Sequence, residues 1–435
     1  MTVNTRLLAS FTALFVLVAC APLAPENGAP ALALNPPDGM PLATGFVKGS
    51  EVTFGADTGN GAAVMFFPET VEALGGRMHG SGTVRETNLD VSLSLRGEPL
   101  PGPHFVAMHA PASFATCDGL LGWPALRRLV WNIDLPAGKH QFERSLPLGL
   151  AGWKRLAIDP QADILTLLMP GVGRVVLDTG APLSVCLSPE KWKAFKKEHP
   201  HVRPTVYWGY SPAAGGYYAR ECAYLASYSL GPWSMKNVLV GETFVSEKAW
   251  GASVPDYVLG IGALDRRTVW IDGSQGWLYY SRPHGDVPQL LGLNQVGVTF
   301  IPKNGHYVAF VAQGSPAEQS GVRSGDVLVA INGKRPDGML AVDHVTTQPG
   351  VRVELCLRRH GQLHLVRWTL GEGLSPAPLQ LHVVRPTTGG SDAAAAPGSP
   401  VLPPASEPAA STPVSAGVPD PLVNSPTRNL IQNHE

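Results

Sequence analysis

Apolar and polar residues divide the chain into segments of different character. Near the N-terminus, Leu7–Ala19 is an apolar run of about 13 residues, shorter than the roughly 20 that a transmembrane helix needs. In the middle, Val91–Leu95 alternates in polarity, as a half-buried strand does, and helical spacing is confined to short segments. Residues 373–435 are rich in Ala, Pro and Ser and bury too little surface to fold. The pattern predicts a mainly β protein with short helices and a disordered tail.

The first segment has the features of an export signal. Arg6 precedes the apolar run, which ends in Leu17-Val18-Ala19-Cys20. This ending resembles the bacterial lipoprotein box, in which the cysteine is acylated and becomes the N-terminus. The resemblance implies a signal peptide at 1–20, a lipid anchor on Cys20 and a linker at 21–38, with the protein facing the periplasm from the outer rather than the inner membrane. An ordinary cleaved signal peptide with an incidental cysteine is the alternative.

Two blocks of sequence occur twice in the middle of the chain. In both copies an Asp-Thr-Gly triplet follows a short apolar run, and a Pro-Glu pair that predicts a helix start comes at the same distance downstream. A Leu-Gly element with a later Ile-Asp pair then closes each copy. Such matched spacing indicates two homologous lobes, at 39–150 and 151–285. The blocks are Asp57-Thr58-Gly59, Pro68-Glu69, Leu121-Gly122 and Ile133-Asp134 in the first copy, and Asp178-Thr179-Gly180, Pro189-Glu190, Leu259-Gly260 and Ile271-Asp272 in the second.

A strand that delivers Asp-Thr-Gly into a turn resembles the active-site loop of the aspartic proteases. Leu120-Leu121-Gly122 and Val258-Leu259-Gly260 resemble the hydrophobic-hydrophobic-Gly element that supports this loop. The resemblance is to the retropepsin-like and bacterial members, and two lobes in one chain imply a pepsin-like, bilobal pair of β-barrels. It implies a catalytic dyad and four supporting residues, namely Asp57 and Asp178 with Thr58, Gly59, Thr179 and Gly180.

The residue types suit peptide hydrolysis without a metal or another cofactor. Two carboxyl groups held close together cannot both ionise, so they share one proton. One then acts as a base for water while the other acts as an acid for the carbonyl oxygen of a polypeptide substrate. Each Thr hydroxyl can hold the opposite loop, and each Gly lets the backbone turn without a Cβ clash. The resemblance therefore implies an aspartic endopeptidase.

The first copy departs from the family pattern after its triplet. Ala181 fits the retroviral type, whereas Asn60 with Gly61 is unusual and leaves open a degenerate first loop. Two alternatives follow: a homodimeric protease that uses only Asp178, and a catalytically inactive peptide-binding envelope lipoprotein. Gly75–Val84 and Tyr207–Tyr217, with Gly pairs that predict hairpin turns, are candidate substrate-covering flaps or exposed hairpins without that role.

The segment after the lobes has another set of spaced motifs. Gly297-Val298-Thr299-Phe300 precedes a strand, and a Gly-Ser-Pro-Ala-Glu, Gly-Asp and Ile-Asn-Gly series follows within 314–333. The series resembles a PDZ domain, here at 286–372, in which an extended peptide adds to a sheet edge. The resemblance implies that residues 297–300 hold a C-terminal carboxylate, although two of them differ from Gly-Leu-Gly-Phe, and that 337–347 form the helix beside the groove. A module that only packs on the lobes is the alternative.

The amino-acid composition limits the kinds of partner that the protein can bind. Lys plus Arg total 33 and Asp plus Glu total 34, so no basic surface for nucleic acid is expected. Charged residues make up 15% of the chain, below the usual quarter or so, which fits an exported protein. The cysteines after Cys20 form no CxxC pair, which argues against a zinc ribbon. They allow either a Cys186–Cys222 disulfide or four free thiols, together with Cys117 and Cys356.

Overall fold

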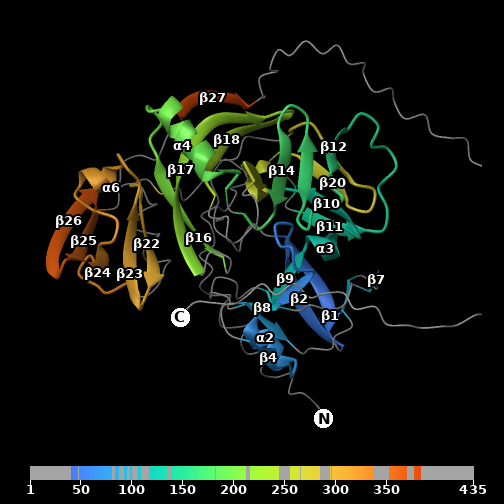
Figure 1. The fold of residues 1–435 in the computed structure, drawn as a ribbon, viewed down its shortest axis with the longest axis horizontal. Helices are drawn as coiled ribbons and strands as arrows, with labels where there is room; N and C mark the ends of the chain where they lie inside the picture. The colour runs from blue at the N-terminus through green and yellow to red at the C-terminus, as the bar shows by residue number, and fades with distance from the viewer. Residues whose placement is uncertain are drawn as a thin grey trace, which may run out of the picture. The chain divides into compact units, whose positions relative to one another are not determined.

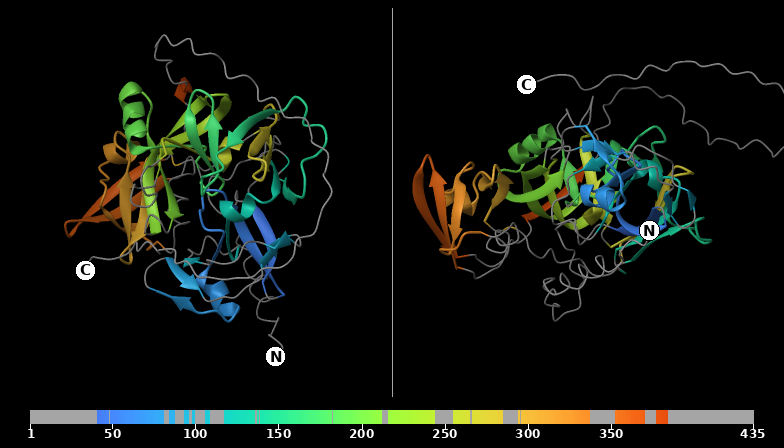
Figure 2. Two further views of the ribbon diagram at one scale, coloured as in Figure 1. Left: turned by 45° about the vertical axis from the view of Figure 1, so that its right-hand side comes forward. Right: turned by 90° about the horizontal axis from the view of Figure 1, so that it is seen from below.

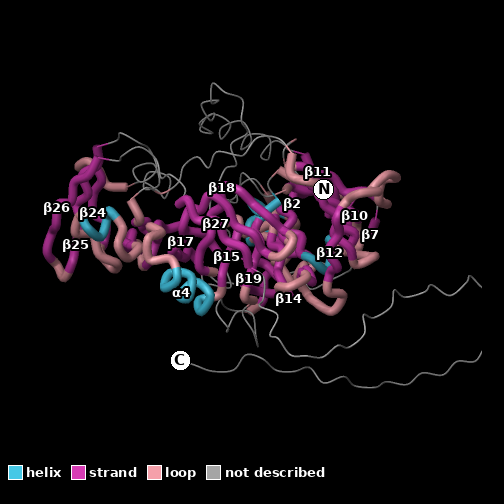
Figure 3. The backbone as a smooth tube through the Cα atoms, turned by 90° about the horizontal axis from the view of Figure 1, so that it is seen from above, coloured by secondary structure: helices cyan, strands magenta, loops and turns pink. Residues whose placement is uncertain are grey.

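The computed structural model describes residues between Pro41 and Val383. Strands dominate these residues, and the helices are few and short (Figures 1 and 3). The predicted mainly β fold class is confirmed. Cys20, the helix predicted at 337–347 and most of the tail lie outside the described residues, whose longest gaps are 100–105, 109–116, 244–254, 285–293, 337–351 and 370–376.

The first lobe is built on a six-stranded sheet with the order β3-β9-β2-β1-β6-β7 and a small sheet with the order β4-β5-β8. Side chains of β1 are exposed and buried in strict alternation, because one face of the strand packs on the core. The strands are β1 Leu42–Val47, β2 Ser50–Asp57, β3 Val64–Phe66, β4 Met78–His79, β5 Val84–Thr87, β6 Leu93–Leu95, β7 Glu98–Pro99, β8 Val106–Met108 and β9 Gly119–Gly122.

Both predicted helices after Pro-Glu are present. Helix α2 (Pro68–Ala73) has proline at its first position, where no backbone donor is needed. The helix ends at Ala73 and is closed by Gly75, whose φ of +73° is left-handed, and by the N–H of Gly76, which donates to the carbonyl of Val71. The prediction of a hairpin turn at Gly75-Gly76 is therefore wrong, because this pair closes a helix.

The second sheet has thirteen strands and receives segments of both copies. Its main path runs β11-β10-β20-β21-β12-β13-β14-β19-β15-β18-β17-β16. Helix α4 (Pro189–Glu198) begins at Ser188, whose hydroxyl accepts from the N–H of Lys191, and it packs beside β15 and β18 (Figure 2). The twelve strands of this path are β10 Val130–Asp134, β11 Lys139–Glu143, β12 Lys154–Ile158, β13 Thr166–Met169, β14 Gly173–Asp178, β15 Val185–Leu187, β16 Thr205–Ser211, β17 Gly216–Leu230, β18 Trp233–Glu242, β19 Tyr257–Gly260, β20 Thr268–Asp272 and β21 Trp277–Tyr280, and the thirteenth strand, off the path, pairs with β17.

The two copies meet in this sheet about an approximate two-fold axis. Strands β10 and β20 carry the matched Ile-Asp pairs and are antiparallel neighbours. Asn132 stands opposite Trp270, which is its own counterpart in the repeat. A strand that pairs with its counterpart in this register requires a two-fold relation between the copies. The sheet therefore continues across the boundary that the sequence suggests between residues 150 and 151.

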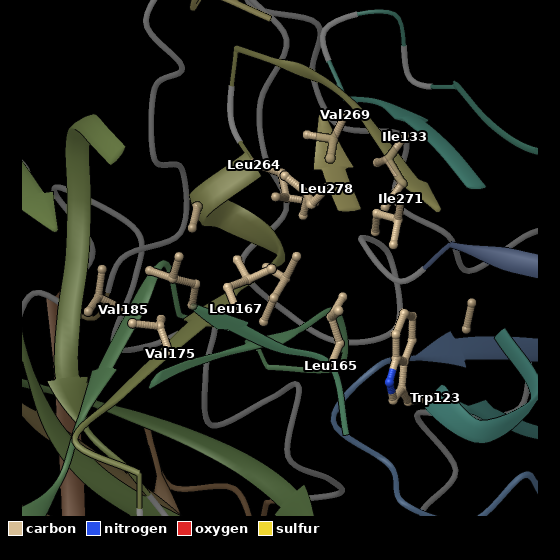
Figure 4. Close-up of a cluster of buried hydrophobic side chains, with 14 of the residues drawn as sticks. Trp123, Ile133, Leu165, Leu167, Val175, Val185, Leu264, Val269, Ile271 and Leu278 are labelled. Carbon is tan, nitrogen blue, oxygen red and sulfur yellow. The ribbon is translucent and has the colours of Figure 1, made fainter. Parts of the chain in front are cut away.

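One hydrophobic core serves both copies. Ile133 from the first copy and Val269, Ile271 and Leu278 from the second belong to the same buried cluster (Figure 4). Burying each such side chain contributes about 1.5–3 kcal/mol. The short elements α3 (Trp123–Leu126) and η3 (Ile261–Leu264) follow the Leu-Gly elements and place their apolar residues in this core. Packing thus holds the two copies in one arrangement.

The cysteines of the second copy are free thiols. Cys186 on β15 and Cys222 on β17 both lie opposite Gly241, on either side of β18. Two strands separated by a third are about 10 Å apart, beyond the roughly 7 Å that a disulfide can span. The proposed Cys186–Cys222 disulfide is absent for this reason, and Cys117 and Cys356 are free as well.

A separate five-stranded sheet follows the lobes, with the order β22-β23-β24-β25-β26 and its own core around Phe300. The next strand, β27 (Ala377–Val383), returns to pair in parallel with β17. This strand lies inside the segment predicted to be disordered, so that prediction is wrong for these residues. The elements of the separate unit are β22 Val298–Lys303, β23 His306–Val311, α6 Pro316–Gln319, β24 Val327–Ile331, β25 Arg352–Arg359 and β26 Gln362–Thr369.

Candidate active site

The two Asp-Thr-Gly loops are built in the same way. Asp57 ends β2 and Asp178 ends β14. In the first copy β9 runs between the two arms of the loop, parallel to β2 and antiparallel to β3. In the second copy β19 runs between β14 and β15 with the same directions. Each of the two aspartates therefore leaves its strand beside the glycine that ends the inserted strand, Gly122 or Gly260.

Those two glycines allow the inserted strand to touch the loop. A Cβ on Gly122 would lie 1.9 Å from the carbonyl oxygen of Ala62, and a Cβ on Gly260 would lie 1.9 Å from that of Leu183. Both distances are far inside van der Waals contact, so no other residue fits without moving backbone. The Leu-Gly element of the repeat is thus explained by close packing against the loop.

Two buried threonines lock the loops together. The hydroxyl of Thr58 donates to the carbonyl of Leu177 at 2.6 Å and accepts from the N–H of Thr179 at 3.0 Å. The hydroxyl of Thr179 donates to the carbonyl of Ala56 at 2.6 Å and accepts from the N–H of Thr58 at 3.1 Å. These symmetric bonds fix the position of one loop relative to the other.

The same contact brings the two carboxyl groups together. Asp57 accepts from the N–H of Gly59 at 3.0 Å, and Asp178 accepts from that of Gly180 at 2.8 Å. Each glycine also packs on the opposite carboxyl group. A Cβ on Gly59 would lie 2.3 Å from Cγ of Asp178, and one on Gly180 would lie 2.9 Å from Cγ of Asp57. Only glycine leaves room for the pair.

Burial and proximity change the acidity of both groups. Burial raises the pKa of Asp57 well above its ordinary value, and the nearby charge of Asp178 and the hydrogen bond between the two side chains raise it further. Burial also raises the pKa of Asp178, although its hydrogen bonds with Asp57 and with backbone N–H groups oppose the rise. Such a pair titrates as a unit and holds one proton over a range of pH.

Asn60 does not disturb the first loop. Its N–H donates to the carbonyl of Asp57 at 3.2 Å, as the N–H of Ala181 does to that of Asp178 at 3.1 Å. Its side-chain oxygen accepts from the N–H of Ala62 at 2.9 Å, which closes a local turn. The unusual residue therefore stabilises a backbone path like that of the second copy.

Sequence reasoning missed Tyr218, which lies on β17 directly after the second candidate flap. It stands opposite Gly209 across the β16–β17 hairpin, and a Cβ there would lie 2.3 Å from its hydroxyl oxygen. Burial raises the pKa of Tyr218 well above its ordinary value, and the charges of Cys186 and Asp178 add to the rise. The Tyr218 side chain is buried, and its ring lies against that of Tyr207 on β16. A glycine opposite a large aromatic residue was the available signal.

The other predicted site residues, 297–300, lie at the start of the five-stranded sheet. Gly297 has a φ of +72°, and its N–H donates to the side chain of Asn294 at 2.9 Å. Val298 and Phe300 are buried in the core of this sheet, whereas Thr299 is buried on the opposite side of β22. The described residues hold no group of three or more His, Cys, Asp or Glu side chains arranged for a metal, and no helix among them is long and apolar enough to span a membrane.

Comparison with known proteins identifies the unit that contains the five-stranded sheet. Residues 307–359 match the family model of the PDZ domain, so this unit is a PDZ domain. The PDZ domain of EpsC from Vibrio cholerae is 21% identical, with a TM-score of 0.15 over 18% of this chain and 79% of that one. An aspartic proteinase from Irpex lacteus is 10% identical, with a TM-score of 0.34 over 57% of this chain and 95% of that one. The chain has no match among curated proteins.

Proposed function

We propose that the chain is an aspartic endopeptidase that hydrolyses peptide bonds in exported proteins. The observation that carries the proposal is the meeting of Asp57 and Asp178 across loops that Thr58 and Thr179 bind to each other. This arrangement has no ready explanation as a structural turn, because it places two acidic side chains together under burial. Burying two carboxyl groups costs desolvation free energy, and residues without charge would serve a structural role at no such cost.

The geometry provides both functions that the reaction needs. The ionised carboxylate of the pair takes a proton from a water molecule, and this water attacks the substrate carbonyl carbon. The protonated carboxyl donates its hydrogen to the carbonyl oxygen as the tetrahedral intermediate forms. The N–H groups of Gly59 and Gly180 hold the carboxyl groups in place during the step.

The pH dependence of hydrolysis tests this proposal. The active form holds one proton on the pair, so activity falls at low pH, where both groups are protonated, and at high pH, where both are ionised. Because the pKa values of both groups are raised, the alkaline limb should lie above the ordinary aspartate value of about 3.9. The measurement is the rate at which the full chain cleaves an unfolded protein, taken over a range of pH. Activity that is flat from acid to alkaline pH, or that a chelator abolishes, would contradict the dyad.

We place the protein in the bacterial cell envelope in this proposal. A lipid anchor on Cys20 would hold it at the membrane, with the folded part in the periplasm. The support is the Leu17-Val18-Ala19-Cys20 ending of the apolar run. Mass spectrometry of the mature protein should find an N-terminal, acylated Cys20, and an unmodified start at another residue would remove the anchor. A Cys20→Ser variant should leave the protein in the soluble periplasmic fraction.

The PDZ domain supplies a second peptide-binding function in this proposal. Strand β22 is at the edge of its sheet, where an extended peptide can pair with the backbone. Residues 297–300 would hold a terminal carboxylate, although the N–H of Gly297 is already bonded to Asn294. The pairing of both aspartates within one chain favours the internal dyad over the homodimer that uses Asp178 alone.

A further inference from the structure

The β16–β17 hairpin and the PDZ domain are joined at three points. Just before β22, the carbonyl of Asn294 accepts from the hydroxyl of Thr205 on β16. Within it, the N–H of Gln313 donates to Glu221 on β17 at 3.1 Å. After it, β27 pairs with Leu225–Leu230 of β17. Strand β22 also lies beside both hairpin strands. The chain thus enters and leaves the PDZ domain on the hairpin strands.

Glu221 is the polar centre of this junction. It is only 9% exposed, and one carboxylate oxygen accepts from the N–H of Gln313. The other accepts from the indole N–H of Trp192 at 3.2 Å and from the ammonium of Lys196, both on α4. Burial alone would raise the pKa of Glu221, but the hydrogen bonds from Lys196, Gln313 and Trp192 outweigh it and lower the pKa. One ionised carboxylate therefore ties together α4, β17 and the PDZ domain.

Strand β17 connects this junction to the dyad. Tyr218 lies three residues before Glu221 on the same strand and is buried, and the charge of Asp178 contributes to its raised pKa. Burial raises the pKa of Tyr217, the preceding residue, and the phenol of Tyr307 on β23 adds to the rise. From β17 the sheet continues through β18, β15 and β19 to β14, which ends in Asp178. A shift of β17 at Glu221 would therefore be passed along this sheet toward the strand that carries Asp178.

We propose that Glu221 is a positioning residue, whose carboxylate fastens β17 to helix α4 and the PDZ domain and so fixes the strand that carries Tyr218. The expected effect on kcat/KM rests on the proposed peptidase function. The attachment of β17 to α4 and the PDZ domain through Glu221 does not. The PDZ domain then supports strand β17 as well as binding a peptide. Loss of this support would shift β17 without changing either aspartate.

The test is Glu221→Gln in the full chain, which keeps the size of the side chain and removes its charge. Amide hydrogen exchange in β17 should become about tenfold faster. Misplacing groups around a reaction by about 1 Å costs up to a hundredfold in rate, so kcat/KM should fall by about tenfold while the midpoints of its pH profile stay unchanged. Lys196→Met, which leaves the carboxylate but removes its cation, should shift both quantities in the same direction.

Glu354→Gln is the matched control, because Glu354 pairs with Arg367 on the PDZ sheet and both side chains are partly exposed. This variant should leave exchange in β17 and kcat/KM as in wild type. Equal exchange in wild type and Glu221→Gln would overturn the fastening. Faster exchange with unchanged kcat/KM would overturn the positioning role. A wild type without peptidase activity would refute the proposed function separately, and the exchange result would still decide on the fastening.

Discussion

Replacing either Asp57 or Asp178 by Asn should lower kcat/KM for peptide hydrolysis by about a thousandfold or more. Acid–base catalysis by a single group contributes about 10²–10⁴-fold, and groups that act as a unit lose most of their effect when one is removed. Asn has nearly the same shape as Asp but cannot take a proton from water at Asp178 or share one at Asp57. The measurement is the initial rate of cleavage of an unfolded protein by each full-length variant.

The pattern of loss separates the three functions considered for the chain. Loss in both variants supports a dyad within one chain. Loss in Asp178→Asn alone supports a homodimer that uses only the second loop, and a wild type without activity favours a peptide-binding protein. Asp163→Asn is the matched control, because Asp163 is an exposed carboxylate close to the first loop and outside the dyad. It should retain wild-type activity.

Gly122→Ala should prevent stable folding of the first lobe. The new methyl group would lie 1.9 Å from the carbonyl oxygen of Ala62 and 2.4 Å from that of Asn60, and both are backbone atoms held by the loop. Relieving the clash means moving β9 away from β2 and β3, which breaks the pairing around Asp57. We expect a loss of more than about 4 kcal/mol in the free energy of unfolding, in the range reserved for severe core changes. Urea unfolding followed by circular dichroism measures it.

Gly61→Ala provides the control for this substitution. Gly61 belongs to the same loop, but a Cβ there would meet its nearest atom, in Asp163, at 3.8 Å, which is ordinary contact. Its unfolding midpoint should stay close to that of wild type. Gly260→Ala in the second lobe should behave like Gly122→Ala, because its Cβ would approach the carbonyl of Leu183 equally closely. Unfolding of Gly122→Ala within about 1 kcal/mol of wild type would contradict the packing described for the loop.

The duplicated motifs predicted much of the site because their chemistry is local. Asp-Thr-Gly ends a strand, Pro-Glu starts a helix and Leu-Gly ends an inserted strand in both copies. Each of these outcomes depends on a few neighbouring residues. The matched spacing also required that the copies share a fold, and a shared fold with a two-fold relation brings Asp57 and Asp178 together.

Other features depend on contacts between distant segments and could not be predicted. The pairing of β10 with β20 and the return of β27 to β17 join residues more than a hundred positions apart. The role of Gly75 depends on whether α2 ends just before it, which the Gly-Gly pair alone does not decide. Cys186 and Cys222 were assigned to the same lobe, but only the sheet order shows β18 between them.

The most direct test of the account is the titration of Asp57 with and without its partner. Carboxyl ¹³C NMR of wild type should show a pKa for Asp57 well above its ordinary value, because burial, the charge of Asp178 and the hydrogen bond with it all act in that direction. In Asp178→Asn the charge is gone, so the pKa of Asp57 should fall toward the ordinary value. An Asp57 carboxyl that titrates identically in both proteins would mean that the two groups do not face each other.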